Sequence, residues 1–243
     1  MRSRILILIS SLLFLFSYGV QVEAGFQDWL KETVKKVGGE KGLSENEIVD
    51  GLKQALEVGT GNAVTMVSKT DGYFKNPKIR IPLPENVEKV ENLLRAAGLG
   101  SQVDKFELSM NRAAERAAPE AKTIFWDAIK QMSFTDARQI LDGPDDAATK
   151  YFQDKTSGRL QEIFKPITHQ AMSEVGVTRS YQSIDDKIKT IPFADRMSFD
   201  LDQYVTDKAL SGLYVMLAEE EKKIRQDPAA RVTDLLKKVF RGN

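Results

Sequence analysis

Apolar residues recur with the period of an α-helix in nearly every segment of this chain after Gly25. The pattern is clear after Ser44 and Glu47, which form a capping box and so mark the start of a helix. The apolar positions that follow fall on one side of that helix: Leu52, Ala55, Leu56, Ala63, Met66 and Val67. No segment of any length alternates with the two-residue period of a strand. The sequence therefore predicts an all-α fold, a single multi-helix bundle domain.

Glycine and proline set the expected ends of these helices and give a count of about ten. Near Gly59, several glycines either permit close approach of another helix or break the helix. A longer helix is expected from about residue 145 to residue 174. It should be strained at Gly158 and at Pro166, because a proline nitrogen has no hydrogen to donate.

The segment from Thr70 to Pro84, which we call the strap, is the exception to the helical pattern. Proline holds the residue before it in extended geometry, so Ile81 and Leu83 should be extended. The strap is too rich in apolar residues for a disordered segment. It should be ordered on the bundle, either covering a groove or only connecting two helices. Arg80 should then pair with a bundle carboxylate or with an anionic ligand.

The N-terminus has the three parts of a secretory signal. Arg2 and Arg4 precede an apolar run from Ile5 to Phe16, and Val22-Glu23-Ala24 suits a signal peptidase. The run is shorter than the roughly 20 residues of a membrane anchor, and no later run is as apolar. We therefore expect an exported chain whose mature form begins at Gly25. Its three parts are a signal peptide (1–24), a short helix with a glycine hinge (25–41) and the helical domain (42–243).

Composition excludes several classes of function. The 35 basic and 35 acidic residues balance, so the chain lacks the basic excess of a nucleic-acid-binding protein. It has no cysteine, which excludes disulfides and thiolate metal sites. His169 is the single histidine and lacks an accompanying nucleophile motif, so we assign no catalytic residue, metal ligand or cofactor. The charged run from Glu219 to Arg225 predicts a solvated helix face.

Three polar residues stand together in an apolar-rich helix: Asn111, Arg112 and Glu115. A buried charge needs a partner, and polar groups gathered in a pocket also orient ligands. We favour a structural network over a ligand site. Arg112 should be largely buried and paired with Glu115 or with a carboxylate from another helix.

The pattern Tyr-x-x-Asp-Lys occurs twice, at residues 151–155 and at Tyr204, Asp207 and Lys208. Tyrosine and lysine four residues apart share a helix face, where the lysine stem can cover the ring. We favour one packing arrangement used twice over two halves of a duplicated pocket.

Four short segments resemble the sequences of an exported bacterial family, domain of unknown function 4197. They are Asn76–Pro84, Phe106–Glu115, Tyr204–Leu210 and Ala218–Arg225. The resemblance covers roughly Gly42 to Phe240 and implies a Gram-negative envelope setting, hence the periplasm. The family supplies no activity and no catalytic residue.

Two classes of function remain open. The first choice is a non-enzymatic envelope protein that binds a small or lipidic ligand or a protein partner. The alternative is a carboxylate-based hydrolase without metal or cysteine, since paired carboxylates can carry out acid–base chemistry alone.

Overall fold

The computed structural model describes residues 45–174, Asp186 and residues 200–226, all in the unit Leu43–Asn243. Every regular element in these residues is a helix, which confirms the all-α prediction for them. The predicted signal peptide, the segment 25–41 and Ser44 of the capping box lie outside this part of the chain. The longer helices are α3 (Glu45–Val67), α6 (Gly100–Ala117), α7 (Ala121–Gln131), α8 (Phe134–Leu141), α9 (Ala147–Glu174) and α11 (Leu201–Gln226). Shorter ones are α4 (Glu85–Glu88), α5 (Glu91–Leu94), η2 (Arg95–Leu99) and η3 (Ala118–Glu120).

The expected count of about ten helices is not supported, because α4, α5, η2 and η3 are single turns of three to five residues and α3 continues through the possible break at Gly59. α3 is one helix of 23 residues that contains Gly59. A Cβ on Gly59 would lie 3.3 Å from Ile224 Cδ1 of α11, so this glycine allows the two helices to approach closely. α9 is likewise one helix of 28 residues and passes through both Gly158 and Pro166. Packing of these helices on their neighbours outweighs the local cost of each residue.

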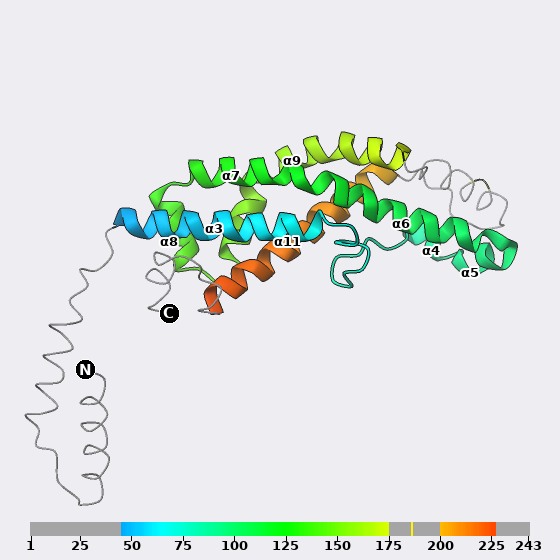
Figure 1. Cartoon of the computed structure of the whole chain (residues 1–243), viewed down its shortest axis with the longest axis horizontal. Helices are drawn as coiled ribbons and strands as arrows, with labels where there is room; N and C mark the ends of the chain where they lie inside the picture. The colour runs from blue at the N-terminus through cyan, green and yellow to red at the C-terminus, as the bar shows by residue number, and fades with distance from the viewer. Residues whose placement is uncertain (1–44, 175–185, 187–199, 227–243) are drawn as a thin grey trace, which may run out of the picture. The chain divides into compact units, whose positions relative to one another are not determined.

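The core lies where α9 and α11 pack along each other and against the other long helices. α3 and α6 contact α11, while α6 and α7 run beside α9 (Figure 1). The ring of Phe125 meets that of Phe152 edge-on at 5.1 Å and lies 6.3 Å from that of Tyr214. Burial of each large apolar side chain contributes about 1.5–3 kcal/mol. None of the described helices has both the length and the apolar content needed to cross a membrane.

The strap joins α3 to α4 and is ordered, but its first part differs from the expected extended segment. Residues 70–79 form mostly turns, and residues 80–84 have no regular structure. Among these turns, Asp71 has a φ of 68°, which lies in the left-handed region that aspartate tolerates. Gly72 follows, where a Cβ would lie 2.5 Å from the Met66 carbonyl oxygen. This close approach requires glycine and turns the chain back as α3 ends.

The strap is part of the core. Tyr73, Ile79, Ile81 and Leu83 are all buried. The Tyr73 hydroxyl also donates a hydrogen bond of 2.6 Å to the Ala209 carbonyl in α11. The strap therefore supplies apolar surface that the helices leave open, in addition to connecting α3 with α4.

Candidate functional site

Asn111 of α6 anchors the strap through both ends of its amide. Its Oδ1 accepts the N–H of Ile81 at 2.8 Å, and its Nδ2 donates to the Ile81 carbonyl at 2.9 Å. Asn111 and Ile81 are both fully buried. A buried backbone needs such partners where no helix supplies them. Asn111 thus takes the place of a neighbouring strand for this part of the strap.

Arg112 and Glu115 form an ion pair that also reaches the strap. The guanidinium of Arg112 donates to Glu115 Oε2 at 2.6 Å and to Asp71 Oδ1 at 2.5 Å. Glu115 Oε1 accepts the N–H groups of Tyr73 and Phe74 at 3.1 and 3.3 Å. Glu115 is the buried member, whereas 29% of the Arg112 side chain is exposed, more than we expected. These contacts describe a structural network that holds the turns of the strap.

Arg80 pairs with Glu107 of α6, a carboxylate of the bundle. The Nε–Oε1 and NH2–Oε2 distances are 2.8 and 2.6 Å. The hydrogen bond to Glu107 raises the pKa of Arg80 against the smaller effect of desolvation. The guanidinium carbon also lies 4.7 Å from the centre of the Phe74 ring. The Glu107 carboxylate and the Phe74 ring therefore hold the Arg80 guanidinium, which we had also considered as a partner for an anionic ligand.

Tyr204 and Lys208 of α11 join the same region. The Tyr204 hydroxyl donates to the Pro82 carbonyl of the strap at 3.0 Å, and Lys208 Nζ lies 5.7 Å from the ring centre. Burial, and to a lesser degree nearby glutamates, raises the pKa of Tyr204 to about 12. The hydroxyl thus remains protonated and available as a donor at neutral pH.

The other copy of the Tyr-x-x-Asp-Lys pattern has the same geometry. The Tyr151 hydroxyl donates to the Ala128 carbonyl of α7 at 3.1 Å, and Lys155 Nζ lies 5.9 Å from the ring centre. In both copies a helix-borne tyrosine reaches a carbonyl of a neighbouring segment while lysine covers its ring. One packing arrangement occurs in two places.

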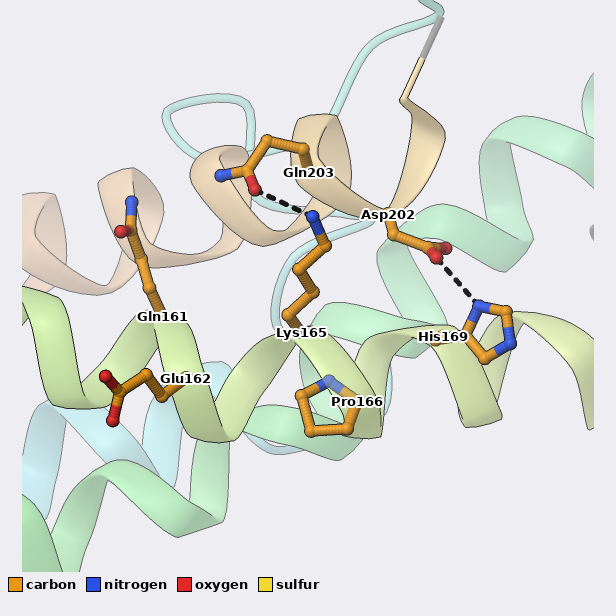
Figure 2. Close-up of a pocket in the computed structure, with 7 residues that line it drawn as sticks. All are labelled: Gln161, Glu162, Lys165, Pro166, His169, Asp202 and Gln203. Carbon is orange, nitrogen blue, oxygen red and sulfur yellow. Dashed lines mark hydrogen bonds and ion pairs between the residues drawn. The ribbon is translucent and has the colours of Figure 1, made fainter.

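A groove of about 520 Å³ lies between α9 and the first turn of α11 (Figure 2). We call it the α9–α11 groove. Its exposed surface is mostly apolar, since the aliphatic stems of long side chains and the Pro166 ring contribute much of it. The lining residues are Gln161, Glu162, Lys165, Pro166, His169, Asp202 and Gln203.

Polar groups of the groove pair with one another from α9 to α11. Lys165 Nζ donates to Asp200 Oδ2 and to Gln203 Oε1, both at 3.1 Å. His169 Nδ1 lies 2.7 Å from Asp202 Oδ2. Figure 2 shows the pairs at Gln203 and Asp202 bridging the two helices. Mutual pairing leaves the aliphatic stems between these polar groups as the exposed surface of the groove.

Asp207 is the residue singled out from the sequence that reaches this groove. Its Oδ1 accepts from Gln203 Nε2 at 2.7 Å and from Gln161 Nε2 at 3.3 Å. The other six candidates lie at or beside the strap: Arg80, Asn111, Arg112, Glu115, Tyr204 and Lys208. The structure therefore places six of the predicted residues in an architectural network and one, Asp207, behind two residues that line the groove.

Sequence reasoning missed most of the groove. His169 is exposed, and neither it nor its partner Asp202 was among the candidate site residues. Pro166 was treated as a source of strain. A proline in a helix leaves the carbonyl four residues before it, here that of Glu162, without its helical donor. The proline at position 166 and the Glu162 carbonyl it leaves without a donor were therefore the sequence feature that could have pointed to this groove.

The charged run near the end of α11 is not a fully solvated face, because Glu220 and Glu221 are buried. Glu221 accepts hydrogen bonds from the Ala148 and Thr149 N–H groups, each at 2.9 Å. These amides belong to the first turn of α9, where a helix has no acceptor of its own. Arg225 in turn donates to Glu221 Oε1 at 2.9 Å. The expectation was wrong because the start of α9 packs on this face.

The described residues contain no group of three or more His, Cys, Asp and Glu side chains arranged to hold a metal ion. These residues define an all-α protein whose buried glutamates pair with groups of the protein itself and which carries an open, largely apolar groove. The family model of a protein of unknown function, DUF4197, matches residues 42–241. The chain belongs to this family, which confirms the resemblance. No curated protein and no solved structure matches the chain.

Proposed function

We propose that this protein is a non-enzymatic binding protein that holds a small amphiphilic ligand in the α9–α11 groove. The observation that carries the proposal is the groove itself. Its volume of about 520 Å³ lies in the range typical of ligand pockets, about 300–1,000 Å³. A mostly apolar surface with polar groups at its edge is also the usual composition of such sites.

The pairing pattern favours a ligand with a hydrocarbon part. Lys165 and His169 already have carboxylate partners, so neither needs a ligand charge for compensation. The hydrocarbon part of a ligand gains by covering the stems between these groups. Its polar part can remain at the edge, near water and the exposed His169 ring.

The buried carboxylates favour binding over the hydrolase alternative. A carboxylate-based hydrolase needs two carboxylates free to exchange protons with a substrate. Glu115 and Glu221 each accept two backbone N–H groups, and Glu220 accepts from Asn62 Nδ2 at 3.0 Å. These three side chains act as structural acceptors.

Export to the periplasm is part of the proposal. The basic residues, the short apolar run and the Val22-Glu23-Ala24 site support it. N-terminal sequencing of protein taken from the envelope should begin at Gly25. Recovery of an intact Met1 on protein that pellets with membranes would contradict it.

Native mass spectrometry of protein purified from its own envelope tests the binding proposal. We expect a co-purified small molecule of low mass. Gln161→Trp should displace it, because Gln161 is an exposed wall residue of the groove. Gln153→Trp is the matched control, since Gln153 is exposed on the same helix and does not line the groove. The absence of a carried molecule, or equal retention by both variants, would refute the proposal.

A further inference from the structure

A second hollow is lined by the first half of α9, by α8 and by the loop between them. Its volume is about 360 Å³, and its apolar wall comes from Ile140, Pro144 and Ala147. A smaller hollow of about 160 Å³ adjoins it, because Asp136, Tyr151 and Lys155 line both. We call the larger one the Tyr151 hollow. It shares no lining residue with the α9–α11 groove.

Tyr151 is held in place by the protein alone. Its hydroxyl donates to the Ala128 carbonyl at 3.1 Å. Its ring meets that of Phe152 edge-on, with centres 5.7 Å apart. A wall fixed in this way costs little ordering when a ligand binds.

Two of the four charged groups of the hollow are already engaged. Lys150 forms an ion pair with Asp146 at 3.0 Å. The Asp136 carboxylate accepts the hydroxyl of Ser133 at 2.6 Å and its N–H at 3.0 Å. The ion pair neutralises Lys150, whereas the Ser133 contacts satisfy the Oδ2 oxygen of Asp136 and leave its charge to act on Lys155 through space.

The other two, Asp154 and Lys155, have opposite charge and lie next to each other in the chain. Within the described residues, neither has an ion-pair partner within 4.0 Å; Lys155 Nζ lies over the Tyr151 ring, 5.9 Å from its centre. A simple anion at Lys155 would be repelled by Asp154 and Asp136. A simple cation at Asp154 would be repelled by Lys155 and Lys150. A ligand that carries both charges close together avoids both penalties.

We infer that the Tyr151 hollow binds a zwitterion, specifically a free α-amino acid with an aliphatic side chain. Lys155 takes the α-carboxylate and Asp154 takes the α-ammonium through charge-assisted hydrogen bonds. The aliphatic side chain packs on Ile140, Pro144 and Ala147. The site is independent of the proposed groove, and each can be tested without the other.

Methyl NMR of the mature chain tests the inference, with Ile140 as the reporter inside the hollow. The probes are L-leucine, 3-methylbutan-1-amine, which lacks the carboxylate, and 4-methylpentanoate, which lacks the amine. We expect L-leucine to shift the Ile140 signal and to bind about tenfold or more tightly than either analogue, because each lost charge removes a charge-assisted contact. Equal affinity for all three probes, or no shift with L-leucine, would overturn the inference.

Variants assign each charge to its residue. Lys155→Gln should weaken L-leucine about tenfold but should not weaken the amine, because the variant removes a repelling charge. Asp154→Asn should likewise weaken L-leucine but should not weaken the carboxylate probe. Both residues are exposed, so both variants should fold. Lys208→Gln is the matched control, since Lys208 covers Tyr204 with the same geometry and does not line the hollow. Unchanged L-leucine binding in Lys155→Gln, or a loss as large in Lys208→Gln, would also overturn it.

Discussion

Replacing Asn111 by leucine tests whether α6 holds the strap through this one side chain. Leucine has a similar volume but no hydrogen-bonding group, so both contacts to the fully buried Ile81 backbone disappear. A buried polar group left without a partner costs about 1–3 kcal/mol. With an N–H and a carbonyl affected, the cost is about 2–6 kcal/mol, and burial of the leucine side chain offsets part of it, so the free energy of unfolding should fall by about 2–4 kcal/mol. Because a domain of this size loses about 2–4 °C per kcal/mol, the melting temperature should fall by about 5–15 °C.

Guanidinium denaturation followed by circular dichroism measures the loss, and hydrogen exchange at the Ile81 amide locates it. Asn92→Leu on α5 is the control, because Asn92 is exposed and the same substitution there should change stability by about 0.5 kcal/mol or less. A loss below about 1 kcal/mol in Asn111→Leu, with unchanged exchange at Ile81, would show that the strap is held by other contacts.

Arg112→Met should lower the free energy of unfolding, measured with denaturant, by about 1–2 kcal/mol. This is less than the loss for a fully buried ion pair, because 29% of the arginine side chain is exposed. A loss near 4 kcal/mol would contradict this prediction. Gly212→Ala should cost about 1–3 kcal/mol in thermal unfolding, since its Cβ would lie 2.7 Å from Tyr73 Cε1. Gly158→Ala, where the space is open, should be neutral or stabilising. Hydrogen bonds from the Ser133 hydroxyl and then its N–H lower the pKa of Asp136. The stabilisation by this carboxylate is therefore present above about pH 4 and lost as the pH falls. The difference in free energy of unfolding between wild type and Asp136→Asn should narrow on acidification. A difference that stays constant with pH would contradict this prediction.

The sequence was sufficient for the all-α class and for the position of the strap. Helical periodicity reports which face is buried, and that information is local. The effect of a glycine is not local. Gly59 allowed two interpretations until Ile224 of α11 was found against it. Pro166 was expected to strain α9, and α9 nevertheless continues through it as one helix.

The polar network of α6 could be anticipated because its members lie one turn apart on one helix. The sequence could not show what they bind, since Ile81 lies 30 residues from Asn111. The groove was harder to foresee, because His169 meets Asp202 only once α9 and α11 lie side by side. In the sequence alone, the buried glutamates Glu220 and Glu221 cannot be told from solvated ones. Only the packing of the start of α9 on this face distinguishes them.

The contact between Glu221 and the first turn of α9 links the folding of two helices. Glu221 lies 72 residues from Thr149, so the chain must close a long loop before this contact exists. Contacts of such sequence separation form slowly compared with helix elongation. A nascent chain that ends at Glu174 would contain all of α9 but would leave the Ala148 and Thr149 amides to water. The start of α9 should therefore become ordered only with the arrival of α11, and late protection of these two amides would report that step.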